Sequence, residues 1–408
     1  MTQYQVTLDE QTLQRLFGGD SQLARLLETI LNQVLDAQVG EQVQAGRYER
    51  TEQRQGYRNG YKPRHLTTRV GTLTLRVPQV REGGFSPELF ARYQRSEQAL
   101  ILTLMEMVVN GVSTRKVARI TEELCGHEFA KSTISDLCKG LDPVVAAWNE
   151  RDLSAKRFPF VLVDALVIKV REGGQVRSCS ALIATGVNEE GYREILGLQL
   201  GDSESERSWT AFFRWLKSRS LSGVDLVVSD NHGGLTNAVR VQFQGASWQR
   251  CQMHLSANIS SAAPKALQED LHARVKAIFD APDLPTARTL LAQVAADYEM
   301  LAPTAIATLE RGFDDATAVL ALPRPYRQRP RTTNGQERLN EEIRRRERVI
   351  RIFPNRSSSL RLLGALLMEQ DEQWSTGKRY FDMTAYWQWR ESQSAPAAPE
   401  GGQSQTVS

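Results

Sequence analysis

An almost wholly apolar run at residues 158–170, which reads FPFVLVDALVIKV, constrains the fold of this chain more than any other feature. Its content of Val, Leu, Ile and Phe predicts a strong β-strand. One acid, Asp164, lies at the centre of the run. Burying a lone carboxylate is costly, so Asp164 must protonate or find a partner. That partner is either a neighbouring backbone group or arginine, or a component of a functional site.

The segments after this run continue the strand pattern. VRSCSALIATGVN and YREILGLQL predict two more strands, which short glycine turns join to the first in an antiparallel meander. A helix over residues 204–219, the strand DLVVSD ending at Asp230, a helix over 235–243 and the strand ASWQRC follow. This succession predicts an α/β fold with a ribonuclease H-like core, a mixed five-stranded sheet whose last two strands run parallel to the first.

The rest of the chain divides around this core by composition and periodicity. We predict these regions: 1–45, a helical segment; 46–96, a basic arm and β-hairpin; 97–150, a helix-turn-helix domain; 151–254, the first part of the core; 255–330, an all-α insertion; 331–391, closing helices of the core, with spans over 350–368 and 374–389; 392–408, a disordered tail. The N-terminal part is thus a mainly helical DNA-binding region, in which Ser113 and Ser132 are predicted to cap two paired helices.

Two basic blocks indicate contact with a polyanion. Residues 47–95 hold eleven Lys or Arg against four Glu, and residues 324–351 hold ten Arg against four Glu. Either block alone fits a solvated surface, but two blocks, the second using only Arg, favour phosphate binding. Tyr48, Tyr57 and Tyr61 interleave the first block, which can be a DNA-binding arm or a solvated loop. The candidate DNA contacts are Arg58, Lys62, Arg64, Lys131, Ser132, Thr133, Arg331, Arg344, Arg345 and Arg346.

The overall composition excludes several classes of protein. Hydrophobic content of 41% and charged content of 24% are ordinary for a globular chain. No apolar run approaches the roughly 18 to 20 residues that span a bilayer, so no membrane partner is expected. The start, MTQYQVTLDE, does not resemble a signal peptide. Four widely spaced cysteines form no disulfide framework, which favours a reducing, cytoplasmic setting.

Residues 332–346, TTNGQERLNEEIRRR, predict a helix that opens on good N-cap residue types. Glu337 lies three residues after Asn334, so its carboxylate can reach back to the cap residue in a capping box. Asp230 likewise has a structural interpretation, as a turn cap before NHGG. Each acid taken alone therefore fits a structural role.

Together, the three acids predict a metal site. In the expected core, Asp164 lies on the central strand, Asp230 at the carboxyl end of the adjacent strand, and Glu337 on a helix that crosses both. Three converging carboxylates suit Mg²⁺ or Mn²⁺, and two such ions can activate a nucleophile and stabilise a leaving oxygen. Beside phosphate-binding arginines, the reaction that this site favours is in-line phosphodiester cleavage and transfer.

Cys251 and His254 form a Cys-x-x-His pair directly after the fifth strand. Two ligands do not complete a tetrahedral zinc site, and the sequence offers no second pair nearby. A structural or substrate-positioning role is therefore favoured over zinc binding.

Four motifs in combination, VDALVIKVR, VVSDNHGGL, WQRCQMH and RTTNGQERLNEEIRRR, resemble the Mutator-type transposases of bacterial insertion sequences. The resemblance extends from GYRNGYKPR to WSTGKRYFDM. It implies a ribonuclease H-like fold with an Asp-Asp-Glu triad, which falls on Asp164, Asp230 and Glu337, and a Cys-x-x-His pair at Cys251 and His254. Asn231 departs from the pattern, since similar proteins often have a smaller residue there.

The resemblance further implies a Mg²⁺-dependent recombinase that binds the terminal inverted repeats of its element, nicks the ends and joins 3′-hydroxyls to target DNA. Such enzymes act as dimers on paired ends, here at the bacterial nucleoid. Two alternatives stay open: a catalytically inactive or domesticated DNA-binding descendant, and a ribonuclease H-like nuclease without strand transfer.

Overall fold

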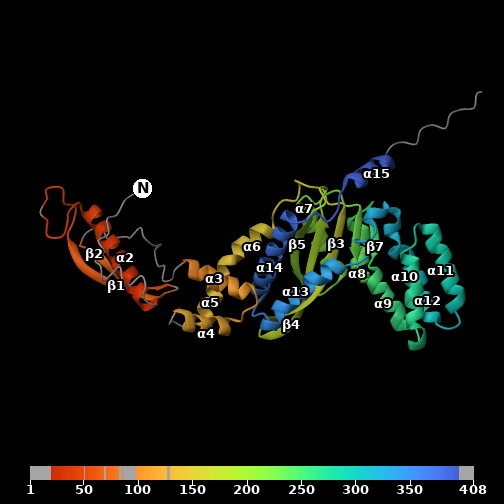
Figure 1. Ribbon diagram of the computed structural model, residues 1–408, viewed down its shortest axis with the longest axis horizontal. Helices are drawn as coiled ribbons and strands as arrows, with labels where there is room; N and C mark the ends of the chain where they lie inside the picture. The colour runs from red at the N-terminus through yellow and green to blue at the C-terminus, as the bar shows by residue number, and fades with distance from the viewer. Residues whose placement is uncertain are drawn as a thin grey trace, which may run out of the picture. The chain divides into compact units, whose positions relative to one another are not determined.

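The computed structural model describes residues 20–49, 51–68, 70–81, 85, 98–125 and 129–394 (Figure 1). Contacts within the chain divide it into two units, residues 1–140 and 141–408. The predicted helical residues 8–19 and most of the predicted tail, residues 395–408, lie outside the described part. No helix of the described residues is long and apolar enough to cross a membrane.

The first unit begins with helix α2 (Asp20–Val43), which packs on a hairpin of β1 (Arg58–Thr68) and β2 (Gly71–Val80). Leu35 of the helix and Leu73 and Leu75 of β2 form its buried core, since alternate residues of a strand face the same side. The sequence predicted a basic arm and a β-hairpin over residues 46–96. The structure starts strand β1 of the hairpin at Arg58, because its register with β2 extends to Val80.

Three short helices complete the first unit: α3 (Gln98–Val109), α4 (Thr114–Cys125) and α5 (Lys131–Cys138). Ser113 accepts a hydrogen bond from the amide of Lys116, which confirms it as the cap of α4. The predicted cap at Ser132 is wrong. Helix α5 starts one residue earlier, after Ala130, which makes no side-chain cap, and Ser132 lies in its first turn.

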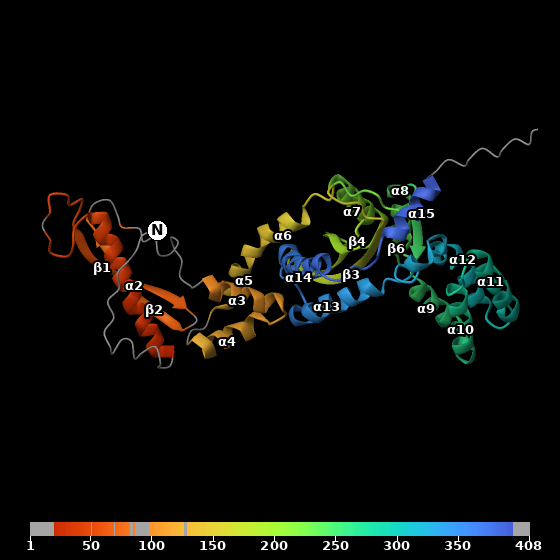
Figure 2. The same cartoon turned by 45° about the horizontal axis from the view of Figure 1, so that its top comes forward.

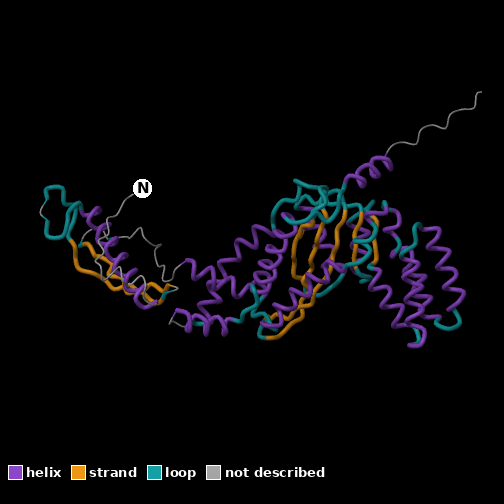
Figure 3. Tube along the Cα trace, in the orientation of Figure 1, coloured by secondary structure: helices purple, strands orange, loops and turns teal. Residues whose placement is uncertain are grey.

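The second unit is built on a five-stranded mixed sheet: β3 (Phe160–Glu172), β4 (Gln175–Val187), β5 (Arg193–Gly201), β6 (Leu226–Ser229) and β7 (Ser247–Arg250). Their order is β5-β4-β3-β6-β7. Figure 3 shows the strands of this sheet side by side, with helices around them. Strands β3, β4 and β5 are antiparallel, and β6 and β7 run parallel to β3. The predicted strand succession and the parallel addition of the last two strands are therefore confirmed.

The two faces of the sheet carry different helices (Figure 2). Helices α7 (Glu206–Ser218) and α8 (Gly233–Gln242) cover the face onto which the odd-numbered β3 residues Val161 and Val163 point. The even-numbered residues, among them Leu166 and Ile168, meet helices α13 (Asn334–Ile350) and α14 (Arg356–Thr376). Asp164 has even parity, so it shares the face of α13.

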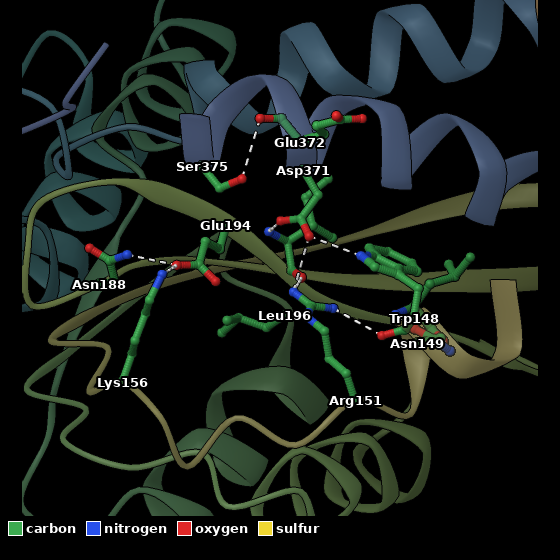
Figure 4. Close-up of polar contacts among 12 residues, drawn as sticks. Trp148, Asn149, Arg151, Lys156, Asn188, Glu194, Leu196, Asp371, Glu372 and Ser375 are labelled. Carbon is green, nitrogen blue, oxygen red and sulfur yellow. Dashed lines mark hydrogen bonds and ion pairs between the residues drawn. The ribbon is translucent and has the colours of Figure 1, made fainter. Parts of the chain in front are cut away.

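Helix α6 (Asp142–Asn149) belongs to the second unit, although the sequence assigned it to the helix-turn-helix domain. Figure 4 shows the polar contacts that hold it there. The indole of Trp148 donates to Asp371 of α14 at 2.9 Å, and the same carboxylate accepts the amide of Ile195 at 2.6 Å. Arg361 of α14 also pairs with Asp142 at 2.6 Å.

Between β7 and α13 the chain forms an all-helical insertion. Its helices are α9 (Gln252–Ala262), α10 (Gln268–Phe279), α11 (Leu284–Tyr298) and α12 (Pro303–Ala316), with short 3₁₀ turns at η3 (Lys265–Leu267), η4 (Ala318–Ala321) and η5 (Arg324–Tyr326). The helices bury a core of their own that includes Leu271, Ile278 and Phe313. The Leu and Ala periodicity of the sequence predicted this helical character correctly.

The closing helices are displaced from their predicted spans. Helix α13 continues to Ile350, Phe353 forms a bridge to β3, and α14 starts only after the Asn355 capping box. The second predicted span covers the end of α14, a loop and the start of α15 (Thr384–Ser394). Apolar periodicity did not reveal this loop, because its Phe381 is buried against the sheet like a helical core residue.

Candidate functional site

The register of the sheet places Asp164 beside Asp230. In the parallel pair of β3 and β6, Phe160 lies opposite Leu226 and Leu162 opposite Val228. Continued by two residues, this register sets Asp164 opposite Asp230, which directly follows β6. Residues at this spacing point to the same face. Both acids are half-buried, and the charge of Asp230 acts on Asp164.

Asp164 interrupts an otherwise apolar face and is held by two donors. Its Oδ1 accepts the amide of Ala165 at 2.8 Å, and its Oδ2 accepts Nδ2 of Asn340 at 2.7 Å. Burial and, to a lesser degree, the negative charge of Asp230 raise the pKa of Asp164 to about 6, although the two hydrogen bonds and the charge of His254 lower it. The partner that the sequence left open thus includes a backbone amide, as the structural interpretation predicted, and also a side chain of α13.

Glu337 lies in the first turn of α13, on the same side of the sheet. The predicted capping box at Asn334 does not form, because Asn334 is already the first helical residue and Thr333 is the N-cap. Oε1 of Glu337 instead accepts the Thr333 hydroxyl at 3.4 Å. Gln336, one residue earlier, accepts the hydroxyl of Thr185 on β4 at 3.0 Å. Helix α13 is thus anchored to the sheet on both sides of Glu337.

Cys251 and His254 lie at the start of α9, next to Glu337. The buried Cys251 Sγ accepts the Thr333 amide at 3.4 Å and its hydroxyl at 3.3 Å, so it ties the end of β7 to the start of α13. Nε2 of His254 lies 3.9 Å from Oε1 of Glu337. The ligand atoms of these three side chains lie within 4.8 Å of one another, a group that could hold a metal ion.

Electrostatic interactions couple His254, next to Cys251, to both Asp164 and Asp230. The hydrogen bond with Cys251 and the charges of Cys251, Glu337 and Asp230 together raise the pKa of His254 to about 9, although burial lowers it. Burial raises the pKa of the Cys251 thiol, but hydrogen bonds from His254 and Thr333 outweigh it and lower the pKa below its ordinary value. His254 is therefore protonated at neutral pH beside the carboxylates.

Two further polar groups border the acids and were not assigned a role from the sequence. Asn340 binds Asp164, and it lies three residues after Glu337, a helical spacing that could have identified it. Glu204, in the loop before α7, has its Oε1 3.7 Å from Nδ1 of His232. Burial raises the pKa of Glu204, and the charge of Asp230 adds to this. Nothing in a single sequence could have brought Glu204 to this site.

The predicted arginine contacts in the second unit have different surroundings. Arg331 pairs with Asp280 of the insertion at 2.6 Å. Arg344 lies 3.7 Å from Glu347, and Arg345 binds Glu342 at 2.7 Å, both on the same helix. Arg346 is 6% exposed and pairs with Glu342 and Glu369. The prediction of Arg346 as a DNA contact is wrong, since its side chain is inside the protein.

The candidate contacts in the first unit also divide by exposure. Arg58 is half-buried, and it donates to the carbonyl of Ala45 at 3.2 Å, so it holds the hairpin against the end of α2 instead of facing solvent. Lys62 is exposed on β1, and Arg64 is half-buried. Lys131, Ser132 and Thr133 are all exposed in the first turn of α5. Lys62 and the α5 residues are therefore accessible to a ligand.

Similarity to known proteins places the chain in a family. Residues 1–377 match the family model described as "Transposase, Mutator family". The chain is 45% identical over 386 residues to the transposase for insertion sequence element IS256 in transposon Tn4001 of Staphylococcus aureus, covering 93% of this chain and 99% of that protein. It is 44% identical over 368 residues to the transposase for ISRM5 of Rhizobium meliloti, covering 90% and 92%.

A third relative, the transposase for IS1081 of Mycobacterium tuberculosis, is 40% identical over 365 residues and covers 88% of this chain and 87% of its own length. Among solved structures, a Mos1 transposase paired-end complex matches 41% of the chain at 10% identity, with a TM-score of 0.15 that is too low to bear on the fold. The sequence matches are strong and span nearly the whole chain. The protein belongs to the Mutator family of transposases.

Proposed function

We propose that this transposase cleaves and joins DNA with Asp164, Asp230 and Glu337 as its catalytic residues, and that its core is ribonuclease H-like. The observation that carries the proposal is the parallel register of β3 and β6, whose continuation sets Asp164 beside Asp230 on the face that α13 covers. The strand order and directions of the sheet support the fold assignment.

The donor set fits Mg²⁺ or Mn²⁺. Three carboxylates supply hard oxygen ligands, and the raised pKa of Asp164, caused by burial and by the charge of Asp230, indicates negative charge that the surrounding protein does not neutralise. One or two such cations, when bound, supply an activated oxygen nucleophile and positive charge at the leaving oxygen.

The residues around the acids prepare them for this role. The amide of Ala165 and the side chain of Asn340 orient the two oxygens of Asp164. His254 holds a proton at neutral pH and, at 3.9 Å from Glu337, offsets part of the carboxylate charge. Cys251 fixes Thr333, the N-cap of the helix that carries Glu337. We therefore assign Cys251 and His254 a positioning role.

A zinc ion is the second candidate for the metal, because the ligand atoms of Cys251, His254 and Glu337 lie within 4.8 Å. Sulfur, imidazole and carboxylate together suit Zn²⁺ better than Mg²⁺. Elemental analysis of the purified protein and of its Cys251→Ser variant separates the two. Stoichiometric zinc that Cys251→Ser loses favours this set, whereas zinc-free protein that cleaves DNA with added Mg²⁺ favours the three carboxylates.

We further infer that the first unit supplies sequence-specific binding to the terminal inverted repeats, through Lys62 on β1 and the exposed first turn of α5, Lys131 to Thr133. Arg64, Arg331, Arg344 and Arg345 remain candidates, the last three with an acidic partner to exchange for phosphate. The protein acts as a homodimer on paired DNA ends, at the nucleoid of its bacterial host.

The test is cleavage and joining of a labelled duplex that ends in the terminal inverted repeat of the element encoding this chain. Wild type with Mg²⁺ is expected to nick the end and join its 3′-hydroxyl to a target plasmid. Asp164→Asn, Asp230→Asn and Glu337→Gln should each lower the rate by about 1,000-fold or more while the duplex still binds. Glu341→Gln, one turn along α13 and exposed, is the matched control and should retain activity.

Three outcomes contradict parts of the proposal. Binding without nicking by the wild type would identify an inactive DNA-binding descendant. Nicking without joining would identify a nuclease. Nicking that persists in Asp164→Asn and Glu337→Gln would remove the catalytic assignment.

A further inference from the structure

Three arginines that are distant in sequence gather at the start of α13. Arg193 is the first residue of β5, Arg329 precedes α13, and Arg338 directly follows Glu337. The guanidinium of Arg193 packs against the helix start, since its Nη1 lies 3.3 Å from the place of a Cβ on Gly335. The charges of Arg329 and Arg338 both act on Arg193. The three side chains thus form one basic group, which we call the α13 arginine cluster.

Aromatic rings hold two of these arginines in place. Two guanidinium groups contact the ring of Tyr380, with Cζ of Arg193 4.7 Å and Cζ of Arg329 4.5 Å from its centroid. Arg193 also stacks 4.0 Å over the ring of Trp374. The amide of Tyr380 donates to the carbonyl of Gly191 at 2.7 Å. Gly191 has a φ of +92°, and a Cβ there would lie 1.9 Å from a backbone oxygen of Phe381, so only glycine permits this close approach.

No acid among the described residues forms an ion pair with the cluster. The neighbouring Glu194 binds Lys156 at 2.8 Å, and Glu337 contacts His254 instead. Burial lowers the pKa of the Arg193 guanidinium, and the charges of Arg329 and Arg338 lower it further, with no carboxylate opposing them. The positive end of the α13 dipole adds to the repulsion. By contrast, Arg274 and Arg288 on the insertion each have an aspartate partner.

We propose that the α13 arginine cluster binds the phosphodiester backbone of the DNA strand at the catalytic carboxylates. Guanidinium groups suit bidentate phosphate contacts, and the cluster contains the residue next to Glu337, so a bound phosphate lies close to the proposed site of cleavage. Arg329 and Arg338 are exposed and Arg193 is half-buried, so the group is open to a ligand from solvent. The inference rests on DNA being the substrate. It adds Arg193, which no sequence motif indicated, to Arg329 and Arg338 of the basic block at residues 324–351.

The test is the salt dependence of binding of the full chain to the fluorescently labelled terminal-repeat duplex, between about 50 and 200 mM KCl. Arg338→Gln and Arg193→Gln should each reduce the slope of log affinity against log salt by about 1, and the double variant by about 2. The paired double variant Arg274→Gln with Arg288→Gln removes the same charge from the insertion and should leave the slope unchanged. An unchanged slope in Arg338→Gln and the double cluster variant overturns the proposal.

A second measurement locates the contact. Single neutral methylphosphonate linkages are placed along the end of the duplex, and affinity is measured for wild type and for Arg338→Gln. A linkage that weakens wild type but not the variant identifies the phosphate bound, whereas independent effects at every linkage overturn the contact. Arg338→Gln should not lower the melting temperature, since it removes like-charge repulsion, and so remains informative if Arg193→Gln fails to fold.

Inorganic pyrophosphate is the competing probe. Binding of micromolar pyrophosphate to wild type but not to the cluster variants, without displacement of the duplex, would assign the group to a small anion and overturn the DNA contact. The salt-dependence test of the cluster and the cleavage test of the catalytic residues can fail independently. Wild type that cleaves, with slopes unchanged in the variants, refutes only the cluster. Reduced slopes in a wild type that never cleaves refute only the catalytic assignment.

Discussion

The first turns of α13 and its last turns differ in how their polar groups are matched. Near the start, Glu337 and Asp230 both act on the charge of His254, Arg338 belongs to a basic group that has no ion pair among the described residues, and the buried Oδ1 of Asn340 has no hydrogen-bond partner among them. Near the end, Arg344, Arg345 and Arg346 each pair with a glutamate. The same helix thus holds uncompensated charge at one end and compensated charge at the other.

This difference indicates that the polar groups at the start of α13 serve function and that those at its end serve stability. Uncompensated polar groups destabilise a fold, so they persist where a ligand completes them. Compensated groups stabilise the packing of α13 on its neighbours and must give up an acidic partner before they can bind a ligand. The arginine run that dominates the sequence therefore lies in the compensated half of the helix, where phosphate binding by Arg344 or Arg345 has to displace a glutamate.

The largest expected effect on stability is at the compensated end. Arg346→Gln removes a buried side chain that bridges Glu342 and Glu369, and should lower the free energy of unfolding by about 3 kcal/mol. Denaturant unfolding measures this. Arg345→Gln is the matched control, since Arg345 binds the same Glu342 but is exposed, and should leave the free energy of unfolding nearly unchanged. An equal loss of unfolding free energy in both variants would show that burial does not distinguish the two ion pairs.

At the start of α13 the expected effect on stability has the opposite sign, and Asp164, the partner of Asn340, tests this. Burial raises the pKa of Asp164 to about 6, so its ionisation favours the unfolded state, and stability is lost as the pH rises from about 4 through 6. Asp164→Asn should therefore abolish cleavage yet raise the free energy of unfolding by about 2 kcal/mol at pH 8 in EDTA. The gain should vanish below about pH 4. A variant that is less stable than wild type at pH 8 would contradict this.

Glu342 supplies the control of opposite sign. The hydrogen bond from Arg345 lowers the pKa of Glu342 most and that from Arg346 adds to it, so that the pKa falls to about 2 although burial raises it. Its contribution to stability is present above about pH 4 and is lost as the pH falls towards 2. Glu342→Gln should accordingly differ most from wild type at neutral pH, in the destabilising direction.

The smallest of these effects concerns a positioning residue. Asn340→Leu removes the hydrogen bond to Asp164 and should lower the cleavage rate by about 10- to 100-fold while the affinity for DNA stays unchanged. Asn340→Asp retains the shape but places a second negative charge at Asp164, so its cleavage rate should recover at a raised metal concentration. Metal titration of the cleavage rate measures both variants.

Gln336→Leu is the matched control, since Gln336 is an amide on the same helix that binds Thr185 on β4 and not a carboxylate. It should affect stability more than the metal dependence of cleavage. If Gln336→Leu and Asn340→Leu change the metal dependence equally, Asn340 has only a structural role.

The amino-acid sequence by itself determined the elements of the core. The run around Asp164 could only be a strand, and the turns and periodicities after it indicated the strand and helix order of the sheet that the structure has. Local signals succeeded because strand period, glycine turns and helical spacing act over a few residues. They failed at Ser132 and at the loop with Phe381, where packing decided the boundary.

Only the tertiary structure decided which polar groups meet. The parallel register of β3 and β6 brings Asp164 to Asp230, although 66 positions separate them in sequence, and α13 adds Asn340 to the pair. The side chain of Arg346 is buried, whereas Arg193 lies with Arg329 and Arg338 in the α13 arginine cluster. Such contacts depend on pairing between distant segments, and no local pattern encodes whether a charge is neutralised. The sequence identifies the charged residues, and the fold determines which of them remain available to bind a ligand.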